Sequence, residues 1–451
     1  MTRVEDTRDA VKHPERAADA VVVGAGPAGS VTALLLARQG LRVILVDRQA
    51  FPRDKPCGEC LSARATRVLD RLGLLDAVEA AQPARLHGWT IHAPGGARFT
   101  GRFGDDGPAL AIERLRLDTL LLDAACAAGA QFFRGHVTGL LRPGDAGAAA
   151  NVVGRGSGSL DGGPARAAGV HGPVTGVAGR DAHGRPFRLY ARLVVGADGL
   201  RSVVARRLGM VRRAPRLRKV SLTTHIDAPG LFPPDTDWLG EMHLGDGACV
   251  GLAPIDATGR RVNLTLVVAG RPAALREERP EAFVADWIRR MPALCDRLGA
   301  CDGNGVHVEG PFLASGPFDV PLRAVVADGA MLVGDAAGYY DPFTGQGIYR
   351  ALASAESLAG IAGRALRLGD TSARRLAPYG RQLNRMVAPG RRLQHVVEWA
   401  LARPRRADRV VRRLARSPDV ADALIAVTGD TRPVRTLLTP GPLARFLFTM
   451  P

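Results

Sequence analysis

A glycine-rich turn near the N-terminus combines residue types that can hold a phosphate. An apolar run leads into Gly24, Gly26 and Gly29, spaced as Gly-x-Gly-x-x-Gly, and the following residues up to Gln39 read as a helix. Gly24 permits a tight turn, Gly26 lets the backbone approach a pyrophosphate, and Gly29 lets the helix pack closely on the strand. The free amides at the start of such a helix attract negative charge.

A second apolar strand follows the helix and ends on Asp47. A carboxylate at this position can accept hydrogen bonds from an adenosine ribose. Strand, helix, second strand and acid come in the order of a dinucleotide-binding βαβ unit, so the sequence predicts that the chain binds a dinucleotide.

Two later turns carry aspartates in a similar setting. Asp198 and Gly199 follow the apolar residues 193–195, while Gly334 and Asp335 follow the apolar residues 331–333. Small residues there let the backbone close on a cofactor, and each carboxylate can accept from ribityl or ribose hydroxyls. Taken alone, Asp335 could equally be a helix N-cap. Together the two turns narrow the prediction from a dinucleotide to a flavin.

The elements between these turns suggest how they are positioned. Apolar spacing predicts helices over 62–80, 116–128 and 281–297; after Met331 it predicts a strand, a turn and then helix to about Ala426. Alternating patterns predict strands within 85–112 and a mostly antiparallel sheet over 220–268. Residues 142–186 are poor in pattern, and the Gly154-x-Gly156-x-Gly158 run inside them reads as a loop.

These patterns predict an α/β fold, α+β overall. A Rossmann-like FAD-binding domain carries an inserted, mostly antiparallel β-sheet substrate domain and is followed by a C-terminal helical region. The expected division is a loose tail over 1–18, a discontinuous cofactor domain over 19–84, 113–215 and 311–370, a substrate domain over 85–112 and 216–310, and helices over 371–451.

At this point the chain resembles the group A flavoprotein monooxygenase superfamily, which has the para-hydroxybenzoate hydroxylase fold. Within it, the chain is most similar to the geranylgeranyl reductase family. The matching pieces extend from position 20 to about 350: they are the first glycine turn with Asp47, the run 55–62 (Lys-Pro-Cys-Gly-Glu-Cys-Leu-Ser), Arg114 with Asp118, residues 196–199 and residues 334–347.

The resemblance implies an extended FAD. Arg114 would meet the ribityl–phosphate region, Asp198 would lie near the pyrophosphate, and Asp335 would hold a ribityl hydroxyl. Residues 341–348 would pass beside the isoalloxazine ring, where helix-start amides can stabilise charge on the reduced flavin. The full set of cofactor-binding candidates is Gly24, Gly26, Pro27, Ala28, Gly29, Asp47, Arg48, Cys57, Gly58, Arg114, Asp198, Gly199, Gly334, Asp335, Pro342, Gly345, Gln346, Gly347 and Ile348.

The catalytic residues are not assigned by the sequence. In the resembled family the loop that carries Cys57 lies against the flavin, so Cys57 and Glu59 are candidates near the ring. A Cys57–Cys60 redox pair is disfavoured because the motif lacks a thioredoxin-like setting. Glu59 reads either as an active-site acid or, preferably, as a solvated loop charge.

Three reactions share this fold. The favoured one is a reductase or dehydrogenase that moves hydride between flavin N5 and a hydrophobic small molecule, geranylgeranyl reductase-like and possible in secondary metabolism, with NAD(P)H as a transient donor. The alternative is an NAD(P)H- and O2-dependent monooxygenase that hydroxylates an aromatic or polyketide-type substrate. A halogenase is disfavoured, because no lysine occurs between Pro56 and Arg218 and Val250–Ile255 replaces the Trp-x-Trp-x-Ile-Pro block. Gly251, Leu252 and Ala253 stand where prenyl reductases usually have aromatics, which argues against an isoprenoid chain specifically.

Composition bounds the remaining questions. The net charge of +17 arises mainly between Arg364 and Arg416, where fifteen arginines meet three acids. Nucleic-acid binding is disfavoured because no recognised module or aromatic interleaving accompanies the arginines. Residues 403–416 are a candidate for weak contact with an acidic carrier protein or an anionic membrane surface, although a solvated helix is the simpler interpretation.

The cysteines and the apolar runs indicate the cellular compartment in which we expect the protein. Six irregularly placed cysteines suit a reducing cytoplasm better than a disulfide framework, and a zinc site built from Cys57, Cys60, Cys295 and Cys301 has unfavourable spacing. We therefore expect no metal. The longest apolar runs are too short to span a bilayer and residues 1–18 lack the apolar core of a secretory signal, so the expected location is cytoplasmic.

Overall fold

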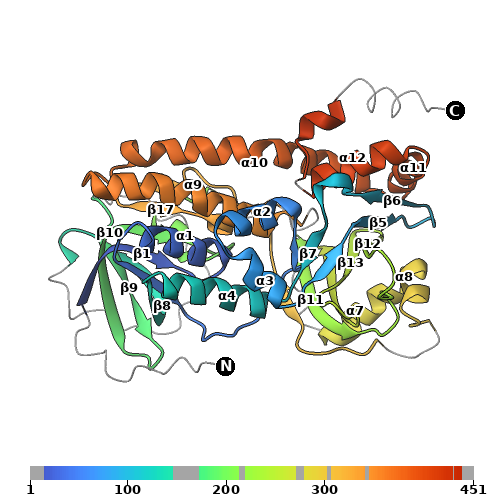
Figure 1. The fold of residues 1–451 in the computed structure, drawn as a ribbon, viewed down its shortest axis with the longest axis horizontal. Coiled ribbons are helices and arrows are strands. Elements are labelled where there is room, and N and C mark those ends of the chain that lie inside the picture. Colours follow the sequence, from blue (N-terminus) through green and yellow to red (C-terminus); the bar gives the residue numbers. More distant parts are fainter. Residues whose placement is uncertain are drawn as a thin grey trace.

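The computed structural model describes residues 15–145, 172–212, 219–270, 279–301, 306–340, 345–429 and 431–438. Its first sheet, at the left of Figure 1, has parallel strands at its centre, with β1 hydrogen-bonded to β2 on one side and to β10 on the other. The strands of this sheet are β1 (Glu15–Val23), β2 (Val43–Asp47), β8 (Gln131–Leu141), β9 (Gly176–Asp181), β10 (Pro186–Gly196), β16 (Val326–Ala327) and β17 (Ala330–Leu332).

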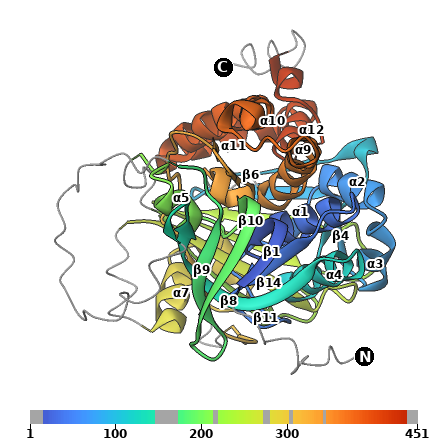
Figure 2. The ribbon, with the colours of Figure 1, turned by 90° about the vertical axis from the view of Figure 1, so that its left-hand side faces the viewer.

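Helices cover the parallel centre of this sheet because strands such as β2, buried along nearly its whole length, are apolar on both faces, as parallel strands are. Helix α1 (Pro27–Ala37) packs between α4 (Arg114–Ala127) and α9 (Gly347–Arg367), and all three share one buried core with β1 and β2. The short helix α5 (Val203–Arg207) contributes to a second core on the other face. Figure 2 shows α1 and α9 side by side above β1.

A second sheet lies at the right of Figure 1 and is antiparallel except where β12 pairs with β5. Its strands, in spatial order, are β15 (Leu313–Ser315), β11 (Lys219–Asp227), β14 (Arg261–Ala269), β13 (Ala248–Pro254), β12 (Leu239–Leu244), β5 (Gly88–His92) and β6 (Arg98–Arg102). A small three-stranded sheet of β3 (Cys60–Leu61), β7 (Ala109–Ala111) and β4 (Ala84–Leu86) completes the strands.

The C-terminal helices join the two halves. Helix α10 (Ala373–Leu401) runs along the top of the molecule over α9, and α11 (Pro404–Ala415) and α12 (Pro418–Thr428) pack on β6 (Figure 1). Asp408 of α11 accepts a hydrogen bond from the Gly95 amide at 2.7 Å, which ties that helix to the turn between β5 and β6. The last described element is the short η5 (Val434–Leu438). The predicted fold class is thus confirmed, with a Rossmann-like part, a mostly antiparallel sheet and C-terminal helices.

Some predicted boundaries were wrong. Residues 15–18 are not a loose tail, because they extend β1 and pair with Arg188–Ala191 of β10. The helix predicted over 62–80 is two helices, α2 (Ala63–Arg71) and α3 (Leu75–Ala80), separated at Gly73, whose φ of 68° ends the first. The helix predicted over 281–297 is likewise divided into α7 (Pro280–Arg289) and α8 (Pro292–Arg297) by Pro292. The Gly154–Gly158 run lies outside the described residues.

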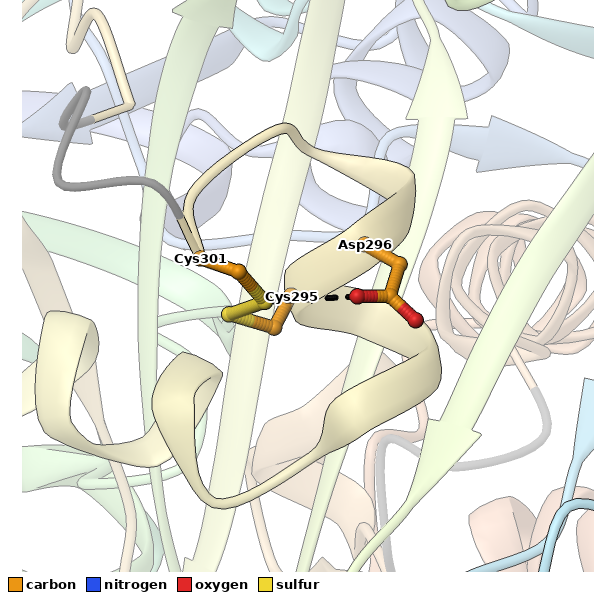
Figure 3. Close-up of a disulfide and its surroundings, with 3 residues drawn as sticks. All are labelled: Cys295, Asp296 and Cys301. Atoms are coloured by element: carbon orange, nitrogen blue, oxygen red, sulfur yellow. Dashed lines mark hydrogen bonds between the residues drawn. A yellow bond between two sulfur atoms is a disulfide. The ribbon is translucent and has the colours of Figure 1, made fainter.

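One disulfide departs from the expectation of unpaired cysteines. The chain turns back after α8 through Gly299, at a φ of 59°, so the Cα atoms of Cys295 and Cys301 come within 5.3 Å and their sulfurs are bonded. Figure 3 shows this bond beside Asp296. The sulfurs of this pair are therefore joined to each other, while the other four cysteines are free thiols.

A histidine pair on the second sheet makes the stability of the fold depend on pH. The rings of His92 and His243 stack 4.3 Å apart, and Nε2 of His243 lies 3.1 Å from Oε2 of Glu241. Burial and the neighbouring His243 lower the pKa of His92 to about 4. Burial opposes the ionisation of Glu241, but hydrogen bonds from His243 and Arg297 outweigh it and lower its pKa to about 2.

The lowered pKa values of His92 and Glu241 change the stability with pH in the same direction. Because the unfolded chain binds more protons than the folded one, we expect stability to fall as the pH drops from about 6.5 through 4 for His92, and from about 4.5 towards 2 for Glu241. Since His92 is only partly buried, solvent screens the effect, and its part is on the order of 1 kcal/mol. Unfolding of the wild type and of His92→Gln by denaturant, at pH 7 and at pH 5, measures the contribution of His92 to this pH dependence. The variant should lose less stability on acidification, whereas His136→Gln, at an exposed position of β8, should behave as the wild type; equal losses in all three would contradict the assignment.

Candidate active site

Three turns meet at one edge of the first sheet. The amide of Gly24 donates to Val46 at 2.7 Å, that of Ala197 to Val23 at 2.8 Å, and that of Val333 to Gly196 at 2.9 Å. These bonds join the chain just past the carboxyl ends of β1, β10 and β17 to neighbouring strands. In open α/β sheets, ligands bind outside such strand ends.

The three glycines of the first turn do different work. At Gly24, with a φ of 101°, an added Cβ would overlap the carbonyl oxygen of Ala197, and at Gly29 it would overlap that of Gly24. At Gly26 the nearest atoms to an added Cβ are guanidinium nitrogens of Arg53 and Arg114, at 3.8 and 3.9 Å. Gly24 and Gly29 thus allow the chain to close on itself, while Gly26 faces open space beside two cations, as a pyrophosphate requires.

Those two cations are fixed by carboxylates. Arg114 is 5% exposed, and its Nε and Nη2 each donate to Asp118 at 2.8 Å. Arg53 also donates to Asp118, at 2.9 Å, and lies 3.7 Å from Asp47. Burial alone would lower the pKa of Arg114, but the charge of Asp118 raises it, so the guanidinium stays charged. Arg53 was missed by the sequence analysis, because an arginine in a loop carries no pattern.

The three aspartates of the predicted flavin motif have distinct contacts. Asp47 accepts from the Ala25 amide at 2.8 Å and so lies against the glycine turn. Asp198 accepts from the Ser202 hydroxyl and the Val203 amide, each at 2.6 Å, and burial raises its pKa. Asp198 therefore binds the first amides of α5, whose N-cap is Ser202. Asp335 is not an N-cap, because it lies inside the short helix η3 (Gly334–Ala337), whose N-cap is Val333, and it lines a cavity.

That cavity has a volume of about 1060 Å³ and extends from the strand ends to the C-terminal helices. Its wall is mainly apolar, and the non-aromatic residues Gly251, Leu252 and Ala253 of β13 form part of it. A cavity near this volume is at the upper end for a small-molecule site, which leaves room for a flat ring and a second ligand. The predicted site residues that line it are Gly26, Pro27, Ala28, Cys57, Gly58, Glu59, Arg114, Gly199, Asp335, Gly345, Gln346, Gly347 and Ile348.

Other predicted residues lie elsewhere. Gly24, Gly29, Asp47, Asp198 and Gly334 shape or brace the turns behind the wall, and Arg48 is exposed. Pro342 lies outside the described residues. Gln346 is 4% exposed and donates to the Thr428 carbonyl at 3.0 Å, so it also joins the start of α9 to the end of α12.

Glu59 is buried, contrary to the preferred interpretation of a solvated loop charge. It is 1% exposed, has a φ of 61°, and accepts from the Arg114 amide at 2.8 Å. Its Oε2 accepts from Asn263 at 2.9 Å and lies 2.8 Å from Nε2 of His225. A non-glycine residue in this backbone region costs free energy, so the surrounding contacts hold Glu59 in place.

His225 faces this carboxylate from the second sheet. It is 8% exposed on β11. Burial alone would lower its pKa, but the hydrogen bond and the charge of Glu59 raise it. Glu59 lines the large cavity and also, with His225 and Glu309, a small hollow on the other side. No sequence pattern indicates this pair, because the two residues are 166 positions apart, with Glu59 in the loop before β3 and His225 on β11.

A lysine lines the cavity as well. Lys55 is close to Gly199, whose added Cβ would lie 3.5 Å from the ammonium nitrogen. Burial and the charge of Arg114 lower its pKa, against the opposing effect of Asp335. Lys55 directly precedes Pro56, so it lies just outside the lysine-free stretch from Pro56 to Arg218 that disfavoured a halogenase.

Comparison with known proteins agrees with this geometry. A model of the FAD binding domain matches residues 17–161 and 168–388. A menaquinone reductase of Mycobacterium tuberculosis (strain CDC 1551 / Oshkosh) is 30% identical over 349 residues, covering 73% of each chain. A digeranylgeranylglycerophospholipid reductase of Methanocella arvoryzae is 26% identical over 372 residues, covering 80% of this chain and 81% of that one. The structure of the flavin-dependent brominase Bmp2 superposes with a TM-score of 0.72 at 18% identity, covering 92% of this chain and 93% of that one, which shows a shared fold.

The fold and the site thus define a flavoprotein of the group A superfamily. The chain belongs to the family of the FAD binding domain, and it is an FAD-dependent oxidoreductase with reductases of the geranylgeranyl reductase type among its relatives. The residues fit FAD: Gly26 opens onto two guanidinium groups, and the amino-terminal residues of both α1 and α9 line the cavity. In the described part of the chain, no helix is long and apolar enough to cross a membrane.

Proposed function

We propose that the protein is a reductase or dehydrogenase that exchanges hydride with a carbon atom of a hydrophobic small molecule, with NAD(P)H as the transient donor. The observation that carries the proposal is the apolar cavity that continues from the cofactor-binding turns to α10 and α12. Two relatives are a menaquinone reductase and a digeranylgeranylglycerophospholipid reductase, and their names support a substrate with a reducible carbon–carbon double bond.

FAD supplies hydride transfer through its N5 atom. Gly26, Arg53 and Arg114 would hold its pyrophosphate, and Asp335 a ribityl hydroxyl. The amides that begin α9 at Gly347 would face the ring and favour negative charge on it. Gly345 and Gly347 leave room for the ring because they carry no side chain.

A double bond that accepts hydride at one carbon needs a proton at the other. Glu59 is the acid that we assign to this step, because it lines the cavity and its hydrogen bond to His225 connects it to the hollow that both residues line. The proton held between Nε2 of His225 and Oε2 of Glu59 moves through the Glu59 carboxyl group to the substrate carbon, which leaves the Glu59 carboxylate and a neutral His225. His225, partly accessible from the hollow, recovers its proton from solvent.

The non-aromatic residues of β13 bear on the choice of substrate. Gly251, Leu252 and Ala253 line the cavity where prenyl reductases usually carry larger, aromatic side chains. A wider, smooth apolar wall favours a bulky or polycyclic hydrophobic molecule as much as an isoprenoid chain.

The test starts from purified yellow protein whose extracted cofactor is identified as FAD. Under anaerobic conditions, bleaching of the flavin by NADPH and by NADH identifies the donor. Menaquinone is then added as a probe, and reoxidation of the flavin with saturation of an isoprenoid double bond supports a reductase. Substrate-dependent oxygen uptake with incorporation of oxygen into the product would instead assign the protein as a hydroxylase.

A halogenase deserves one control because Lys55 lines the cavity. The absence of the Trp-x-Trp-x-Ile-Pro block still disfavours that activity. Turnover with bromide or chloride and oxygen, analysed by mass spectrometry, should produce no halogenated product.

A further inference from the structure

The exposed residues of the cavity wall fall into two groups. Gly58 and Gly345 lie at the cofactor end. The others form what we call the cavity rim, and they belong to α10, to η5 and to the residue just before η5: Pro389, Arg392, Val396, Trp399, Pro433 and Arg435. The apolar interior therefore opens to the surface at the C-terminal helices, far along the chain from the cofactor turns.

The rim carries most of the exposed large apolar surface in the described part of the chain. Three large apolar side chains are more than half exposed, and two of them, Val396 at 60% and Trp399 at 64%, lie one turn apart on α10. The third, Leu368, follows α9 and does not line the cavity. Exposed apolar side chains that gather at one opening mark an interaction site, whereas a single one needs no explanation.

Cations surround these apolar groups. Arg392 and Arg435 belong to the rim, and the guanidinium of Arg406 stacks 4.1 Å from the ring of Trp399. The acids nearby are engaged inward: Glu398 pairs with Lys219 at 3.0 Å, and Asp408 bonds the Gly95 amide. An exposed tryptophan flanked by arginines is the combination that binds at a bilayer interface, where the ring enters the headgroup layer and the cations meet anionic lipid.

We propose that the cavity rim docks on an anionic lipid bilayer. A hydrophobic substrate would then enter the cavity from the membrane without crossing water. The substrate's route rests on the proposed function, but the docking itself rests on the exposure and charge of the rim. Two signals, apolar insertion and arginine attraction, act together, and neither alone gives stable attachment.

The test uses the FAD-loaded full chain and sedimentation with vesicles. At 50 mM salt we expect binding to vesicles of phosphatidylcholine with phosphatidylglycerol, and binding weaker by about tenfold to phosphatidylcholine alone. Raising the salt to 500 mM should weaken binding to the anionic vesicles, because the arginine contribution is screened. Val396→Asp should lower the partition coefficient by about tenfold.

Leu368→Asp is the matched control, since it puts the same charge on an equally exposed apolar position outside the rim. Its vesicle binding should equal that of the wild type, and flavin content and circular dichroism verify that both variants fold. As a second measurement, the fluorescence of the wild type should shift to shorter wavelength on anionic vesicles, and Trp399→Phe should lose that shift.

The results separate the possible partners. Failure of the wild type to bind anionic vesicles, equal loss of binding in Val396→Asp and Leu368→Asp, or binding of an acidic carrier protein in place of vesicles would each overturn the proposal. Oxygen-dependent hydroxylation by a vesicle-binding enzyme would overturn the proposed function and leave the docking intact.

Discussion

Replacing Gly26 with alanine is expected to lower the affinity for FAD by about a hundredfold, roughly 2.7 kcal/mol, while the apoprotein folds as before. The reason is the open space beside this residue. An added Cβ meets nothing closer than 3.8 Å within the chain, so the fold tolerates it. The same methyl group would stand where the backbone must approach the pyrophosphate. Flavin content after purification and titration of the apoprotein with FAD measure the effect.

Gly29→Ala is the matched comparison, because its Cβ would overlap the carbonyl oxygen of Gly24 within the chain itself. It should lower the free energy of unfolding of the apoprotein by about 1–3 kcal/mol, as overpacking does. A Gly26→Ala protein that retains flavin at the wild-type level would show that the cofactor does not approach this turn.

Replacing Glu59 with glutamine is expected to slow substrate reduction by about 10²- to 10⁴-fold, the usual contribution of a positioned acid. Glutamine keeps the shape and can still accept from the Arg114 amide, but it has no proton to give. Its amide group also faces the donor of Asn263, where the carboxylate accepted a hydrogen bond. Reduction of the flavin by NAD(P)H should continue near the wild-type rate, since that step needs no acid at this position.

The pH profile distinguishes a proton donor from a structural carboxylate. Because Glu59 raises the pKa of His225, the wild-type rate of substrate reduction should fall as the pH rises through that raised pKa. In His225→Gln this alkaline limb should disappear, while His183→Gln, at an exposed turn, should keep it. A Glu59→Gln enzyme with the wild-type rate would remove Glu59 from the chemistry and leave only a bracing role. Titration of the His225 ring by NMR, with or without turnover, should show its pKa falling in Glu59→Gln.

The parts of the site that follow from sequence are those in which a few consecutive residues do the work. The roles of Gly24, Gly26 and Gly29 can be predicted without knowledge of the tertiary structure, because each glycine is required by the local geometry of the strand–turn–helix. The same holds for the apolar strands that carry the turns to one edge. Gly73 and Pro292 are residues that can end a helix, but the apolar spacing of a helix continues across both positions. The sequence therefore predicted one helix where the structure has two.

The contacts between distant segments were decided by tertiary structure. Glu59 and His225 meet because the loop after β2 packs against β11 of the other sheet, and burial then turns an apparent surface charge into a held acid. Likewise, Asp198 rather than Asp335 binds the first amides of a helix, since the direction of the following chain determines which amides a carboxylate can reach.

By itself, the sequence determined the flavoprotein class, because phosphate recognition depends on local backbone geometry that glycine spacing dictates. Only the tertiary structure decided the acid, the second arginine at the pyrophosphate turn and the opening of the cavity at α10. Those features depend on which segments pack against each other. Packing determines how strongly a charged group is desolvated, and it determines which side chains, such as Trp399, stay exposed.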